Sequence, residues 1–84
     1  MKLLNDMLKI DDIRIWDLPD DKIGLCFENF SYTKDGNFLI GEFGRGRTFE
    51  EALKDYSRII SGKTLVSHPD GENRKEIKIL TIGD

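Results

Sequence analysis

The sequence predicts an α+β fold in which one central helix packs on one face of an antiparallel sheet of about four to five strands. Three observations support this prediction: a helix with both ends marked in the sequence, short segments of alternating apolar and polar residues around it, and turn motifs between those segments. We expect the 84 residues to form a single domain over 1–84. The expected order is a short N-terminal helix, three strands, the central helix and two strands, which contains the order β-β-β-α-β.

The central helix has clear ends. Thr48 precedes Glu51 at the spacing of a capping box, in which the threonine hydroxyl accepts a hydrogen bond from an early backbone N–H. Gly62 stands where a left-handed residue ends a helix, since glycine has no Cβ to clash there. Apolar residues recur between these ends at helical offsets, and they are Phe49, Ala52, Leu53, Tyr56, Ile59 and Ile60. An amphipathic helix that covers the sheet is therefore predicted.

Alternating segments predict the strands. These segments are 13–18, 23–32, 37–43, 63–67 and 76–82, with a short amphipathic helix expected over 1–10. Turns are indicated at 19–22, 33–36 and 69–71, and the second carries the Asp-Gly pair typical of hairpins. The apolar alternation of the second strand changes face near Asn29, which predicts a β-bulge there.

Composition narrows the class of partner. The chain has 13 basic and 16 acidic residues and a net charge of -3, which is neither the basic excess of a general nucleic-acid binder nor the acidic excess of a nucleic-acid mimic. Its one cysteine, Cys26, cannot form an internal disulfide, and no apolar run is long enough to span a membrane or to act as a signal peptide. We therefore expect a cytoplasmic protein without a membrane partner.

No residue combination indicates catalysis, a cofactor or a metal. His68 and Cys26 each lack the nucleophile, base or further metal ligands that chemistry requires nearby in sequence. Cys26 lies between apolar residues of a strand, as a buried, unreactive thiol does. An acidic run, without the spacing of a calcium loop, is expected at a solvated edge or facing a basic partner, and it comprises Asp11, Asp12, Asp17, Asp20 and Asp21.

The segment Gly41-Glu-Phe-Gly-Arg-Gly-Arg-Thr48 is a candidate anion site. It leads from a strand to a helix start, where free N–H groups with Arg45 and Arg47 would hold a phosphate. The third glycine of a dinucleotide motif is absent, however, and Glu50-Glu51 adds negative charge, so a glycine-rich turn before a capped helix is the simpler alternative.

A second basic set belongs to the last strand and is formed by Arg74, Lys75 and Lys78. These residues would form one basic face with Arg45 and Arg47 if the last strand neighboured the glycine loop. Because no aromatic residue interleaves with this set in the sequence, a stacking platform for single-stranded nucleic acid is not indicated. Binding of a nucleic acid or nucleotide is left open.

The aromatic side chains have more apolar surface than one helix can cover. The set comprises Trp16, Phe30, Tyr32, Phe38 and Phe43. We expect Trp16, Phe30 and Tyr32, together with apolar residues of the first helix, to contact a partner or a second copy in a homodimer or higher oligomer. If the first helix folds back on its own sheet, the chain would be a monomer.

The residues Gly46-x-Thr48-x-Glu50-Glu51-Ala52, after a strand, a Lys-Asp-Gly turn and another strand, resemble HicB-type antitoxins. The resemblance covers roughly 23–66. It implies a HicB-like sheet with one helix, a dimer, and tight binding of a small toxin ribonuclease. The chain departs from that pattern in lacking a Pro-Gly-Cys-like loop before the helix.

The whole chain also resembles short phage and prophage proteins of Gram-positive bacteria. The similar segments are Asp17-Leu-Pro-Asp20, Arg47-Thr-Phe-Glu-Glu-Ala52, Ile60-Ser-Gly-Lys-Thr-Leu65 and Asn73-Arg-Lys-Glu76. This resemblance implies a non-enzymatic phage protein that inhibits a host protein such as a defence nuclease, a counter-defence role of the anti-CRISPR type. The alternatives are an antitoxin that neutralises a small ribonuclease and a protein that sequesters a nucleotide at the Gly-Arg-Gly-Arg loop.

Overall fold

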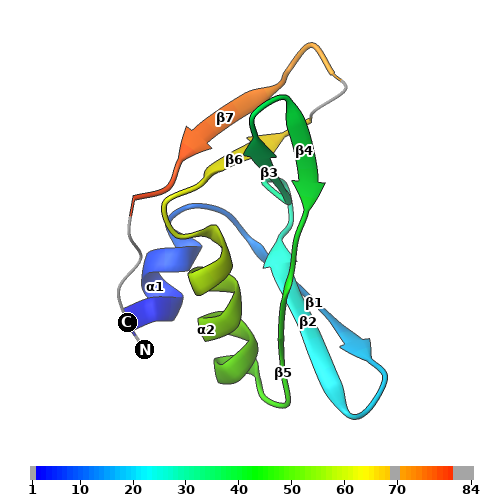
Figure 1. Cartoon of the computed structure of the whole chain (residues 1–84). Helices are drawn as coiled ribbons and strands as arrows, with labels where there is room; N and C mark the ends of the chain where they lie inside the picture. Colours follow the sequence, from blue (N-terminus) through cyan, green and yellow to red (C-terminus); the bar gives the residue numbers. More distant parts are fainter. Residues whose placement is uncertain (1, 69–70, 81–84) are drawn as a thin grey trace.

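The computed structural model describes residues 2–68 and 71–80, which form two helices and seven strands (Figure 1). In chain order these elements are α1 (Lys2–Leu8), β1 (Ile13–Leu18), β2 (Lys22–Phe27), β3 (Tyr32–Asp35), β4 (Phe38–Gly41), β5 (Gly44–Gly46), α2 (Phe49–Ile60), β6 (Thr64–Ser67) and β7 (Lys75–Lys78). The predicted α+β class is confirmed. The described residues contain no helix long and apolar enough to cross a membrane.

The strands form two antiparallel sheets, and the predicted single sheet of about four to five strands is wrong in this respect. One sheet has three strands in the order β1-β2-β5, and the other has four in the order β4-β3-β6-β7. The chain leaves the first sheet after β2 and returns to it at β5, so the predicted strand 23–32 is divided between the sheets, and β5 lies beyond the predicted strand 37–43. Both helices lie on the same side of β1-β2-β5 (Figure 1).

Helix α2 has the ends that the sequence predicts. The Thr48 hydroxyl accepts a hydrogen bond from the backbone N–H of Glu51 at 3.1 Å, and Gly62 takes a left-handed φ of 78° after the last turn. Its inner face is fully buried against the first sheet through Ala52, Leu53, Tyr56 and Ile60. The Tyr56 hydroxyl accepts a hydrogen bond from the Phe27 N–H at 3.3 Å, which joins the helix to the end of β2.

Two glycines of β5 allow α2 to lie directly on the strand. A Cβ on Gly44 would stand 2.4 Å from the carbonyl oxygen of Ala52 and 2.6 Å from the Tyr56 Cβ. A Cβ on Gly46 would stand 2.5 Å from the Ala52 nitrogen. Such distances are far shorter than carbon atoms tolerate, so the Gly-Arg-Gly sequence is required for this packing.

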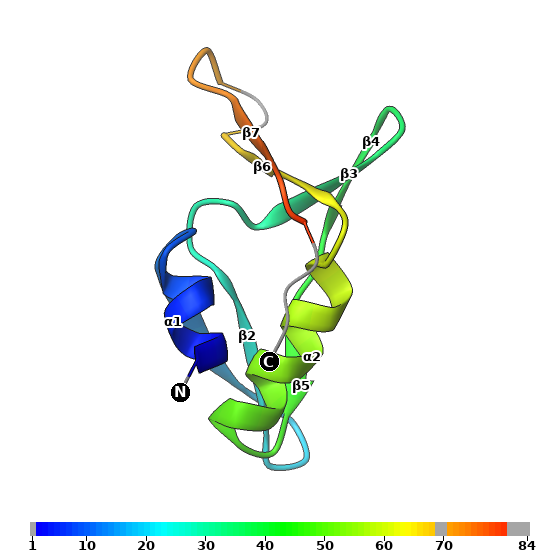
Figure 2. The ribbon, with the colours of Figure 1, turned by 90° about the vertical axis from the view of Figure 1, so that its left-hand side faces the viewer.

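Helix α1 folds back beside α2, as both views show (Figures 1 and 2). Leu3 and Met7 are buried in the same core as Leu53 and Tyr56. The chain itself therefore covers part of the apolar surface for which the sequence predicted an oligomeric contact. Other large apolar side chains are exposed, above all Phe38, which is 75% exposed on β4. The oligomeric state stays a prediction.

Asp11 stabilises the segment in which the chain passes from the first sheet to the second. Its carboxylate accepts hydrogen bonds from the backbone N–H groups of Asn29 at 2.7 Å and Phe30 at 3.0 Å, and from the Asn29 side-chain amide at 2.9 Å. Because these N–H groups donate to Asp11, they do not extend the ladder of β2. The β-bulge predicted near Asn29 is therefore wrong, and the chain changes sheet there instead.

The end of the chain agrees with the sequence in part. Strand β6 lies within the predicted segment 63–67, and β7 overlaps the start of the predicted segment 76–82. Residues 69–70 of the predicted turn and 81–82 of the predicted last strand lie outside the described residues.

We expect Gly44→Ala to lower the free energy of unfolding by about 2 kcal/mol, because α2 must shift to admit a methyl group. Gly41→Ala is the matched control, since a Cβ there would lie 3.6 Å from the Tyr32 ring, an ordinary contact distance. Urea denaturation followed by circular dichroism measures both. Equal stability of the two variants would contradict the proposed role of Gly44.

A second prediction concerns how the stability of the protein depends on pH. Burial raises the pKa of the Asp11 carboxyl, but the hydrogen bonds from Asn29 and Phe30 outweigh burial and hold it below its ordinary value. A lowered folded-state pKa stabilises the protein above the unfolded-state pKa of about 3.9, and this stabilisation is lost as the pH falls through the folded-state value. Asp11→Asn should therefore cost about 1 kcal/mol at neutral pH, and the difference from wild type should vanish in acid.

The control for this experiment is Asp12→Asn, because the side chain of Asp12 is exposed and forms no ion pair with the residues that the structure describes. Urea denaturation of the three proteins at neutral pH and in acid measures the effect. A cost of Asp11→Asn that does not change with pH would show that its charge is not what holds the crossing segment.

Candidate functional site

A row of two adjacent aromatic side chains with an arginine at each end lies on the face of the three-stranded sheet opposite α2. We call Arg14, Trp16, Phe43 and Arg45 the outer row. Arg14 and Trp16 belong to β1, whereas Arg45 belongs to β5 and Phe43 immediately precedes it. Because Gly44 faces α2 and side chains alternate along a strand, Phe43 and Arg45 point to the other face.

The members of the outer row touch one another. The ring centroids of Trp16 and Phe43 are 5.3 Å apart with the planes tilted by 59°, a favourable arrangement for two aromatic rings. The guanidinium carbon of Arg14 lies 5.5 Å from the Trp16 centroid, and that of Arg45 lies 4.9 Å from the Phe43 centroid. Both arginines thus make cation–π contacts, and neither forms an ion pair within the described residues.

Gly24 provides the floor beneath Trp16. It lies on β2 between Trp16 of β1 and Arg45 of β5 in the strand register. A Cβ on Gly24 would stand 2.5 Å from the Trp16 ring, so the ring lies flat against the backbone of β2. Trp16 is half-buried as a result, and its position is fixed by the sheet rather than by a loop.

A hollow of about 260 Å³ opens beside the outer row, where the chain crosses between the sheets. Its lining residues are Arg14, Trp16, Cys26, Ser31, Tyr32, Gly41, Glu42 and Phe43. Aromatic side chains from β1, from β3 and from the segment before β5 therefore meet around it. Tyr32 is 39% exposed here, and its ring lies over Gly41.

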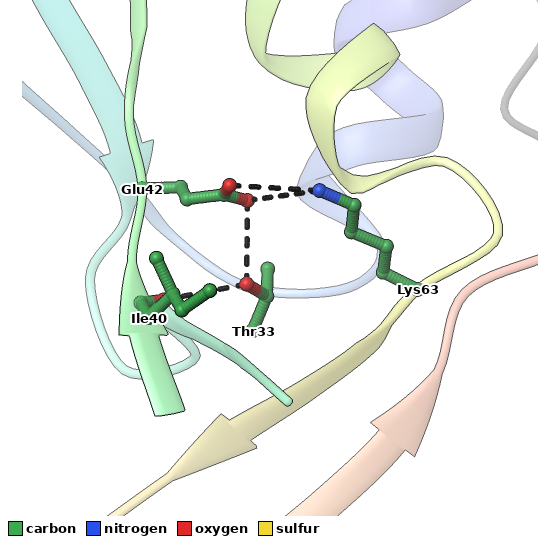
Figure 3. A network of polar contacts seen from close by, with 4 residues as sticks. All are labelled: Thr33, Ile40, Glu42 and Lys63. Atoms are coloured by element: carbon green, nitrogen blue, oxygen red, sulfur yellow. Dashed lines mark hydrogen bonds and ion pairs between the residues drawn. The ribbon is translucent and has the colours of Figure 1, made fainter. Parts of the chain in front are cut away.

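The two charged residues at the hollow differ in their partners. The Glu42 carboxylate contacts the buried Thr33 hydroxyl at 3.3 Å and the Lys63 ammonium at 3.4 Å, and these three residues join β3, the segment before β5 and the segment after α2 (Figure 3). Arg14 instead lies 4.0 Å from the Cys26 sulfur. The positive charge of Arg14 therefore has no carboxylate beside it among the described residues.

Cys26 does not neutralise Arg14. The thiol is only 3% exposed, and this burial raises its pKa more than the neighbouring Arg14 charge lowers it. A thiol with a raised pKa stays protonated at neutral pH and is a poor nucleophile. The prediction that Cys26 is buried is confirmed. Because the protonated thiol is uncharged, it does not offset the positive charge of Arg14 at the hollow.

Comparison of the chain with protein-family models, with curated proteins and with solved structures finds no match. Within residues 2–68 and 71–80, no group of three or more histidine, cysteine, aspartate or glutamate side chains is arranged to hold a metal ion.

The structure divides the predicted site residues among several places. Trp16 and Arg45 belong to the outer row, and Tyr32 lines the adjoining hollow. Phe30 instead packs against the core of the first sheet. The Arg47 side chain is exposed beyond the end of β5 and has no ring contact in the described part of the chain.

Of the simpler alternative, the capped helix is confirmed and the glycine-rich turn is wrong. Gly44–Gly46 is a strand of the first sheet, and the Arg45 N–H donates to the Asp55 carboxylate at 2.9 Å. The Thr48 hydroxyl caps the helix N-terminus itself. The amides that a bound phosphate would need are therefore partly engaged within the chain.

The single basic face predicted from two segments is wrong. Arg74, Lys75 and Lys78 lie at or on β7, which pairs with β6 in the four-stranded sheet, whereas Arg45 lies on β5 in the other sheet. Arg74 also pairs with Glu76 at 3.1 Å. The strand register separates the two basic sets because the last strand does not neighbour the glycine loop.

Sequence reasoning missed Arg14 and Phe43. Their positions were readable, since Arg14 and Trp16 stand two residues apart on one strand, as do Phe43 and Arg45. The expectation that no aromatic residue interleaves with Arg45 is also wrong, because Phe43 and Trp16 do so in space. What the sequence lacked was the pairing of β2 with both β1 and β5, which brings the two motifs together.

We expect Gly24→Ala to displace the Trp16 ring, because the new methyl group would occupy its place. Trp16 is the chain's single tryptophan, so its fluorescence emission reports the change directly and should move to longer wavelength. Gly71→Ala serves as the control, since a Cβ there would lie 3.6 Å from its nearest atom. Unchanged emission in a folded Gly24→Ala variant would contradict this account of the outer row.

Proposed function

We propose that the chain is a non-enzymatic binding protein that inhibits a host protein, with the outer row and the adjoining hollow as its contact surface. The observation that carries this proposal is the outer row itself. Tryptophan, tyrosine and arginine are the residues that most often dominate binding energy in protein interfaces. Here the guanidinium groups of Arg14 and Arg45 rest on aromatic rings, so less side-chain entropy is lost when a partner binds.

The charge distribution favours a protein partner over a nucleic acid. A protein that follows a phosphate backbone neutralises several phosphates with lysine and arginine. The outer row supplies two cations, and the chain as a whole carries a net charge of -3. The resemblance to phage proteins suggests a host partner, such as a defence nuclease, in the bacterial cytoplasm.

A HicB-like antitoxin is the second candidate, in which the partner is a small ribonuclease toxin. The order of β3, β4, β5, α2 and β6 along the chain and the Thr48 cap support this candidate, whereas β5 lies in a different sheet from β3, β4 and β6 and not in the one sheet that the resemblance implies. Co-expression with a toxin encoded by a neighbouring gene distinguishes this candidate, because only an antitoxin restores growth. Nucleotide sequestration at the loop has less support, since Asp55 and Thr48 occupy its hydrogen-bonding groups.

The test is affinity capture from a bacterial host lysate with three forms of the protein. Wild type should recover one partner in stoichiometric amount, and Arg14→Glu with Arg45→Glu should recover at least about tenfold less, because reversed charges oppose the same partner groups. Lys75→Glu with Lys78→Glu changes the net charge equally on the other sheet and should bind like wild type.

Two results would overturn the proposal. One is the absence of any stoichiometric partner, and the other is an equal loss in both double variants. Arg47→Glu distinguishes the outer row from the anion-loop alternative. The anion loop requires Arg47, whereas the outer row does not. The recovered protein should also lose its own activity when the wild-type chain is added, as an inhibitor requires.

A further inference from the structure

The size of the hollow limits what it holds. Its volume of about 260 Å³ is below the range of roughly 300–1,000 Å³ that is usual for small-molecule sites. Its lining combines the aromatic side chains of Trp16, Tyr32 and Phe43 with polar groups of Arg14, Ser31 and Glu42, so it suits an occupant in which an apolar group stands beside a polar one. A single large side chain matches both the size and the lining, as anchor residues of protein interfaces do.

The charged residues at the hollow indicate which kind of partner residue would lie next to that side chain. Arg14 lines it and forms no ion pair with any residue in 2–68 or 71–80, while the Glu42 carboxylate is engaged by Thr33 and Lys63. Arg45 lies farther along the sheet, two residues away in the strand register, and is also without an ion pair in the described part of the chain. An occupant that carries a carboxylate beside an apolar group would thus meet complementary charge on this face.

We propose that the hollow receives one apolar side chain of the partner protein, and that Arg14 binds an acidic residue next to that side chain. This inference rests on the proposed function, because it specifies the partner segment that the outer row contacts. The fixed position of Trp16 on Gly24 supports it, since an anchor pocket with a rigid wall costs little to organise. A nucleotide is disfavoured, because its doubly charged phosphate would meet a single guanidinium, that of Arg14.

The inference is tested with 3-phenylpropionate, a small molecule that joins an aromatic ring to a carboxylate. Its neutral isostere 3-phenylpropionamide has the same shape, and uridine monophosphate is the nucleotide probe. The indole N–H resonance of Trp16 reports binding without ambiguity, because the chain has no other tryptophan. We expect the acid to bind with a Kd of about 1 mM and the amide to bind about fivefold more weakly.

Variants assign the preference to one side chain. Arg14→Gln should abolish the difference between acid and amide while amide binding persists, because the apolar walls are unchanged. Arg47→Gln is the matched control, since it removes one exposed arginine outside the hollow and should retain the fivefold difference. Wild-type affinity of each variant for the amide shows that the hollow is intact, because the free Trp16 resonance itself moves when Arg14 no longer lies over the ring.

Three results would overturn the inference: equal binding of acid and amide, tighter binding of uridine monophosphate than of the acid, and no shift of the Trp16 resonance up to about 10 mM probe. Its failure is separable from that of the proposed function. Partner capture that depends on the outer row, without a preference for the acid, overturns the anchor and retains the binding protein. A preference for the acid without partner capture overturns the proposed function and retains a hollow that binds carboxylates.

Discussion

Direct contact between the backbones of α2 and β5 determines most of this structure. Gly44 and Gly46 remove the side chains that would separate helix from strand, so the apolar face of α2 reaches through to Leu25 and Phe27 of β2. The same alternation that turns the glycines toward α2 turns Arg45 away from it. One local sequence therefore closes the core on one face of the sheet and supplies a functional candidate on the other.

Local patterns in the sequence were sufficient for the elements but not for their division into sheets. The cap at Thr48 and the left-handed Gly62 depend on neighbouring residues, and both were predicted correctly. The break after β2 depends on Asp11, whose carboxylate binds backbone N–H groups 18 and 19 residues away. In the sequence, Asp11 is indistinguishable from the other aspartates of an acidic run, so a short-range pattern cannot identify its role.

The candidate site shows the same limit. Trp16, Tyr32 and Arg45 were predicted as contact residues, although Arg45 was assigned to an anion loop and not to an aromatic surface. The correct grouping needs the register of three strands, because Arg45 meets Trp16 only across Gly24. The basic residues of β7 were grouped with Arg45 for lack of that register. Residue types were therefore more predictable than their neighbours in space.

The outer row has a structural part and a part available for binding. The two aromatic rings belong to the first, and the two arginines belong to the second. Trp16 and Phe43 cover the backbone around Gly24, so a purely structural requirement accounts for the two rings. It does not account for the arginines, because an exposed guanidinium over a ring adds only about 0.5–1 kcal/mol, and apolar or paired residues would cover the rings equally well. Arg14 and Arg45, which form no ion pair among the described residues, leave two charges available on a rigid aromatic surface, and this combination of fixed shape and available charge is what a specific interface requires.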